Sequence, residues 1–132
     1  MHRLIAIISL LAGGGDFAAG LLMLAAPQTA LRLMHVPPVS DSVWVGFVGV
    51  FVACVGLSYL LGLIAWKTIG GSCELRAVWE ITAIFRLAAG SFVAVQIGLG
   101  HFDHAWITVP CADFFWACLQ LAILGRGFPN RE

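Results

Sequence analysis

The sequence predicts an all-α membrane protein, an antiparallel bundle of four transmembrane helices. Of its 132 residues, 61% are hydrophobic and only 11% are charged, whereas a typical soluble domain carries about a quarter charged residues. The apolar residues also gather into four long runs, and a helix needs about 20 mostly apolar residues to cross a bilayer. We therefore expect four spans, at Leu4–Ala26, Val43–Trp66, Ala77–Leu99 and Ala105–Leu124.

The first span begins directly after Met1-His2-Arg3, a start that resembles a secretory signal peptide. The apolar run continues to Ala26, however, so we expect it to be retained as a span. Pro27 then ends the span and can begin a new helical turn. Residues Gln28–His35 place apolar side chains beside Arg32, which predicts a short amphipathic helix at the membrane interface.

The remaining breaks contain the residues that usually end or start helices. Pro37-Pro38 stops the short helix, and Ser40–Ser42 offers an N-cap for the second span. Gly70-Gly71 marks the next turn, and Gly100–His104 forms a tight last hairpin. No linker or low-complexity segment interrupts the chain, so we expect residues 1–132 to form a single transmembrane domain.

The basic residues predict that both termini are cytoplasmic, because Lys and Arg concentrate in cytoplasmic loops. On the other side of the predicted membrane only Arg32 is found, and Arg86 lies within a span. The basic residues on the side of the termini are Arg3, Lys67, Arg76, Arg126 and Arg131. Trp44, Trp66 and Trp106 lie near span ends, where aromatic side chains often meet the membrane interface.

Each predicted span carries a stripe of small or polar residues at alternating steps of three and four, which is typical of faces buried between helices. The stripes are Ser9, Gly13, Asp16, Gly20 and Met23; Gly46, Gly49, Ala53, Gly56 and Leu60; Ala83, Arg86, Gly90, Val93 and Ile97; and Pro110, Asp113, Ala117, Gln120 and Leu124.

Three of these stripes contain a deep charge. Measured from the cytoplasmic ends at 1.5 Å per residue, Asp16 and Asp113 are each about 18 Å deep and Arg86 about 14 Å. We therefore expect a charged cluster of Asp16, Arg86 and Asp113 within the membrane. Two carboxylates around one guanidinium leave one negative charge, so either a carboxyl group is protonated or a cation or ligand compensates.

The cluster has two interpretations. Intramembrane charges are functional candidates, which favours a proton or cation relay or a site for a polar ligand group. A buried ion pair that fixes helix register is the structural interpretation. Glu80 could reach Arg76, four residues earlier, or extend the cluster. Gln96 and Gln120 could extend it too, or form hydrogen bonds between helices.

No cofactor and no catalytic residue are predicted. His35, His101 and His104 fall on the outer side of the predicted membrane, where a zinc or copper site is the alternative to solvated interfacial histidines. We expect the four cysteines to be small apolar packing residues. The chain has no phosphate-binding loop, GxSxG, HExxH or CxxC motif. Its zero net charge predicts no nucleic-acid partner.

The chain resembles small bacterial four-helix membrane proteins of the DoxX-like kind. The resemblance rests on chain length, on Gly14-Gly15-Asp16 and Ala26-Pro27, on Arg86-Leu-Ala-Ala-Gly90, and on Asp113. Some members of that group accompany membrane redox complexes, so the resemblance implies an accessory role and a bacterial inner-membrane location. It transfers no site residue.

Three functions are consistent with these observations. The first is a non-catalytic accessory or assembly subunit of a larger inner-membrane complex, in contact with lipid and with other membrane subunits or copies of itself. The second is a small proton- or ion-coupled transporter, or a hydrophobic-ligand pocket protein, that uses the charged cluster. The third is a membrane enzyme that uses Asp16 and Asp113 as an acid/base pair on a lipid-like substrate.

Overall fold

The computed structural model describes residues 2–70 and 72–127, and the regular secondary structure of this part of the chain is all helical. Within these residues, four segments are long and apolar enough to cross a membrane, namely α1, α3, α4 and η1 together with α5. The predicted all-α fold and its four long apolar helices are thus confirmed. The elements are α1 (His2–Ala25), α2 (Pro27–Leu33), α3 (Val43–Ile69), α4 (Ser72–Gly98), the 3₁₀ helix η1 (His104–Ile107) and α5 (Thr108–Gly125).

The helices extend beyond the apolar runs from which they were predicted. The second predicted span ended at Trp66, whereas α3 continues to Ile69, and α4 begins at Ser72 rather than at Ala77. Backbone hydrogen bonds of a helix do not depend on side-chain polarity, so the helices continue through polar flanking residues. Gly70 ends α3 in the left-handed conformation, with φ of 73°, which glycine adopts without steric cost.

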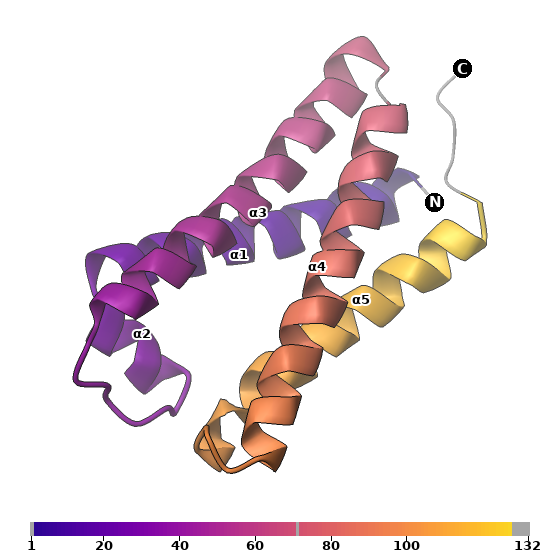
Figure 1. Cartoon of the computed structure of the whole chain (residues 1–132). Coiled ribbons are helices and arrows are strands. Elements are labelled where there is room, and N and C mark those ends of the chain that lie inside the picture. The colour runs from indigo at the N-terminus through magenta and orange to yellow at the C-terminus, as the bar shows by residue number, and fades with distance from the viewer. Residues whose placement is uncertain (1, 71, 128–132) are drawn as a thin grey trace.

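The long helices form two antiparallel hairpins (Figure 1). Helix α1 packs against α3, α4 packs against α5, and the two hairpins meet through α3 and α4. Figure 1 shows α3 and α4 diverging from the turn that joins them, and the start of α1 and the end of α5 lie toward the same end of the molecule as this turn. Helix α2 and η1 lie toward the opposite end.

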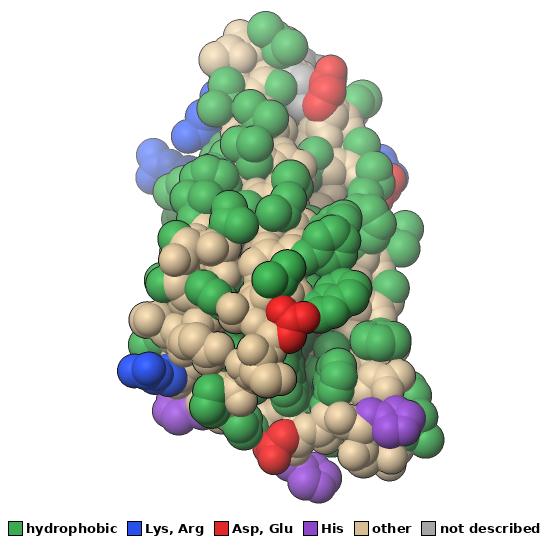
Figure 2. Space-filling model, turned by 60° about the vertical axis from the view of Figure 1, so that its left-hand side comes forward, with side chains coloured by type: hydrophobic (Ala, Val, Ile, Leu, Met, Phe, Trp, Pro, Cys, Tyr) green, Lys and Arg blue, Asp and Glu red, His purple; other side chains and the backbone are tan. Residues whose placement is uncertain are grey.

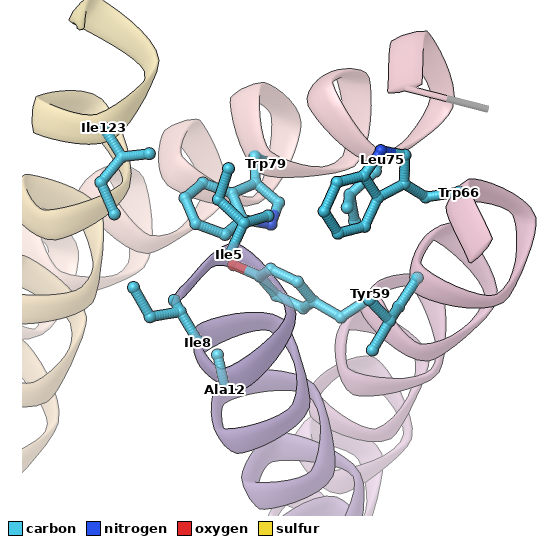
Figure 3. Close-up of a cluster of buried hydrophobic side chains, with 9 residues drawn as sticks. Ile5, Ile8, Ala12, Tyr59, Trp66, Leu75, Trp79 and Ile123 are labelled. Carbon is cyan, nitrogen blue, oxygen red and sulfur yellow. The ribbon is translucent and has the colours of Figure 1, made fainter. Parts of the chain in front are cut away.

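A hydrophobic core joins all four long helices near the turn between α3 and α4 (Figure 3). Trp66 is only 2% exposed in this core and stacks on His2 at 5.6 Å between ring centroids. Trp66, which the sequence placed near a span end, lies in the last turns of α3, and its ring packs inward on the core. The buried core residues are Ile5, Ile8, Ala12, Tyr59, Leu63, Trp66, Leu75, Trp79 and Ile123.

Helices α1 and α3 touch through their backbones. Gly13 and Gly20 on α1 face Gly56 and Gly49 on α3, and the two glycines of each helix are seven positions apart. A Cβ atom on Gly49 would lie 2.8 Å from the Gly20 carbonyl oxygen, and one on Gly56 would overlap backbone atoms of Phe17. These glycines are required for the close approach of the two helices, as their stripes predicted.

The predicted stripes are wrong toward the ends of two helices near the core. Beyond Gly56, α3 buries Tyr59 where the stripe continued to Leu60. In α5 the buried residue is Ile123, whereas Leu124 is only partly buried. A helix rotates by about 100° per residue, so a small change in crossing angle exchanges neighbouring positions at the interface.

Helix α2 closes the other end of the α1–α3 hairpin. The chain leaves it through a Schellman motif, in which the Val36 amide donates to the Leu31 carbonyl at 2.9 Å and the His35 amide to the Arg32 carbonyl at 3.0 Å. His35 is in the left-handed conformation, with φ of 59°. Leu31 and Val36 are buried against Met23 and Val45, with Trp106 of η1 packed beside them.

The exterior of the helices is largely apolar. Figure 2 shows hydrophobic side chains over most of one face of the molecule, with histidine side chains gathered at its lower end. Trp44 is 65% exposed. All four cysteines, Cys54, Cys73, Cys111 and Cys118, are free and exposed, so their prediction as packing residues is wrong. Cys54 and Cys118 each follow a stripe residue directly, and successive helix residues point about 100° apart.

Candidate functional site

Three helices meet at one ion cluster. One terminal nitrogen of the Arg86 guanidinium, Nη2, donates to Oδ2 of Asp16, and the other, Nη1, donates to Oδ1 of Asp113 at 3.1 Å. The residues come from α4, α1 and α5 respectively. The predicted meeting of the three side chains is confirmed, and this cluster joins the α1–α3 hairpin to the α4–α5 hairpin.

Small residues determine how closely these side chains approach one another. A Cβ atom on Gly90 would lie 3.2 Å from Cβ of Asp113 and 3.1 Å from the ring of Phe114. Glycine at this position therefore lets α5 pack closely on α4, one helical turn from Arg86. On α1, Asp16 lies between Gly13 and Gly20, whose close contact with α3 positions that helix.

The cluster is buried at its centre and open at its edge. The Arg86 side chain is 8% exposed, whereas those of Asp16 and Asp113 are 21% and 17% exposed. With both carboxylates ionised, the cluster carries one uncompensated negative charge. Its partly exposed oxygens can therefore accept a proton, or a hydrogen bond from a cationic group outside the chain.

A second polar network lies beside the cluster. Of its three residues, only Gln120 was predicted from the sequence. Nε2 of Gln120 donates to the Tyr59 hydroxyl and, at 3.0 Å, to Oγ1 of Thr82, and the Thr82 hydroxyl donates to that of Tyr59 at 2.8 Å. The Tyr59 hydroxyl also lies close to the Arg86 guanidinium. Tyr59, Thr82 and Gln120 are almost completely buried, and they link α3, α4 and α5.

Helical spacing is the signal that would have identified this network. Thr82 precedes Arg86 by four residues, and Gln120 follows Asp113 by seven, so each shares a helix face with a member of the ion cluster. Tyr59 follows Gly56 by three residues, so it lies on the same face of α3 as that stripe residue.

A further hydrogen bond between helices runs from Nε1 of Trp79 on α4 to Oγ of Ser9 on α1, at 2.9 Å.

Two of the residues predicted as possible extensions do not join the cluster. Glu80 pairs with Arg76 at 2.8 Å, and both side chains are exposed. Oε1 of Gln96 bonds Nδ1 of His101 at 2.8 Å, also in an exposed position. Only Gln120 joins the buried polar residues.

The described residues include no group of three or more His, Cys, Asp or Glu side chains that could hold a metal ion. His35, His101 and His104 are exposed. They do not form such a group with Asp41 or Asp103. Within this part of the chain, the ion cluster is therefore the arrangement with the most distinctive chemistry.

Comparisons of the chain with protein-family models, with curated proteins and with solved structures find no match.

Removing the Tyr59 hydroxyl should weaken the contact between the hairpins. We expect Tyr59→Phe to lower the free energy of unfolding by about 1 kcal/mol, because Thr82 and Gln120 lose a shared buried partner. Unfolding in mild detergent with added denaturing detergent measures this change. Ser58→Ala is the matched control, since the Ser58 hydroxyl bonds the Val55 carbonyl of its own helix, at 2.7 Å. Equal stability losses in the two variants would contradict an interhelical role for Tyr59.

Proposed function

We propose that the chain is a polytopic membrane protein that serves as a non-catalytic accessory or assembly subunit of a larger bacterial inner-membrane complex. The observation that carries this proposal is the ion cluster, which holds one carboxylate in excess and leaves both carboxylates partly exposed within otherwise apolar helices. A charge in the middle of a bilayer costs at least about 2.5 kcal/mol. A neighbouring subunit that offers a cation or hydrogen-bond donors would remove most of that cost.

The exterior supports association as well as insertion. Large apolar side chains such as Phe51, Phe85 and Phe115 are more than half exposed, and lipid or the apolar surface of a membrane subunit would cover them. The ion pairs of Arg86 with Asp16 and Asp113 hold α1, α4 and α5 together. A fixed arrangement of these helices is suited to a docking surface.

The distribution of basic residues supports cytoplasmic termini. Arg3, Lys67, Arg76 and Arg126 lie near helix ends at the side of the α3–α4 turn, whereas Arg32 lies on α2 at the opposite side. Arg131, which entered the same prediction, lies outside the described residues. An excess of Lys and Arg marks the cytoplasmic side of membrane proteins.

The mass of the native particle tests the proposal. We expect the protein, extracted from its native membrane in a mild detergent, to migrate in a stable particle much larger than one chain and to contain other subunits. A bare monomer or small homo-oligomer would overturn the proposal. It would favour instead the proton- or ion-coupled transporter, whose proton uptake should be lost in Asp16→Asn and Asp113→Asn.

A further inference from the structure

Beside the ion cluster, α1 has an uncovered strip of small residues. Gly15 and Ala19 are exposed and lie on one side of Asp16, at about 100° and 60° around the helix. A Cβ atom on Gly15 would meet nothing within 4 Å. On α5, Ala112 is exposed next to Asp113. We call Gly15, Ala19 and Ala112, with the two carboxylates, the α1–α5 strip.

The α1–α5 strip lies between the two hairpins rather than inside one of them. The close helix contacts of α1 are with α2 and α3, and those of α5 are with α4 and η1. The Asp16 and Asp113 side chains are 21% and 17% exposed, so a helix that approaches this strip can reach their oxygens. Small residues on both sides would let its backbone come close.

Charge complementarity identifies the chemistry of that helix. Arg86 compensates one of the two carboxylates, so one negative charge of the pair is left without a cation. No other Lys or Arg in the part of the chain that the structure describes bonds either carboxylate. A second cation would make the cluster neutral, and in a bilayer the gain is larger than at a surface exposed to water.

We propose that a membrane-spanning helix of a partner subunit, with one Lys or Arg near its middle, docks on the α1–α5 strip and completes the ion cluster. This inference rests on the proposed function, because it names the partner chemistry of an accessory subunit. The partner's cation is structural. It neutralises the charge left on Asp16 and Asp113 and fixes the depth at which the two proteins associate.

A synthetic helix tests the inference without knowledge of the natural partner. The probe is a Leu/Ala transmembrane peptide with one central Lys, and the reference is the same peptide with Gln in place of Lys. Energy transfer between a labelled peptide and the labelled full chain in phosphatidylcholine vesicles measures association. We expect the Lys peptide to associate about tenfold more tightly than the Gln peptide, and Asp16→Asn to reduce this preference.

Two substitutions locate the contact. Gly15→Leu and Ala19→Leu place bulk on the strip and should abolish association of the Lys peptide. Gly14→Leu is the matched control, because a Cβ atom on Gly14 also meets nothing within 4 Å but points about 160° away from Asp16. Helical content measured by circular dichroism should stay unchanged in all three variants, and Ala19→Leu carries the test if Gly15→Leu fails to fold.

The outcomes separate this inference from the proposed function. Equal association of the Lys and Gln peptides, or full association with both Gly15→Leu and Ala19→Leu, would overturn the docking inference. If the native particle is nevertheless large and mixed, only the docking inference fails. If the native particle is the bare chain, the proposed function fails, and the docking inference, which rests on it, fails as well.

Discussion

The Arg86→Gln protein is expected to lose about 3–5 kcal/mol of unfolding free energy, which is enough to prevent folding of most of the protein. Arg86 bridges Asp16 and Asp113, and its side chain is 8% exposed. Glutamine cannot compensate either charge, so two carboxylates would face each other in an apolar setting. Folded yield in mild detergent, and unfolding by a denaturing detergent, measure the loss.

Two further variants separate the ion cluster from a general effect of charge removal. Arg76→Gln removes an Arg of the same helix whose partner, Glu80, is exposed, and exposed pairs contribute at most about 1 kcal/mol. The triple variant Asp16→Asn, Arg86→Gln, Asp113→Asn should recover much of the loss, since neutral amides can hydrogen-bond to one another. Normal stability of Arg86→Gln alone would show that the cluster does not hold the helices together.

The second large effect is expected at the contact of α1 and α3. Gly56→Leu should abolish the folded state, because a side chain at this position overlaps backbone atoms of Phe17 and the Gly13 carbonyl oxygen. Backbone atoms cannot move aside as a flexible side chain does, so the two helices must separate. Gly56→Ala should already cost about 3 kcal/mol, the upper part of the range for overpacked cores.

Other glycines of the chain provide controls for Gly56. A Cβ atom on Gly14 or on Gly98 would meet nothing within 4 Å. We expect Gly14→Ala and Gly98→Ala to keep wild-type stability or to gain a few tenths of a kcal/mol from better helix propensity. Thermal unfolding followed by circular dichroism compares all these variants. A Gly56→Ala protein as stable as Gly14→Ala would contradict direct backbone contact between α1 and α3.

Much of the ion cluster could be predicted from sequence because depth along a helix is a linear function of residue number. Asp16, Arg86 and Asp113 fall at similar depths in their spans, and each lies on a stripe of small residues. Lipid-exposed charge is costly, so such residues were expected to face one another. Sequence alone did not show that Tyr59 and Thr82 continue this polar network, because hydroxyl groups carry no charge that would demand a partner.

The sequence by itself determined the class of fold, the number of long helices and their approximate limits, because helical hydrogen bonds are local and apolar runs are visible in one dimension. Only the tertiary structure decided which side chains face inward near helix ends. Trp66 is buried and Cys118 is exposed, because neighbouring helix residues point about 100° apart and only packing decides which of them faces a partner. That packing combines the backbone contact of α1 with α3 at Gly20 and Gly56 with the core that all four long helices share.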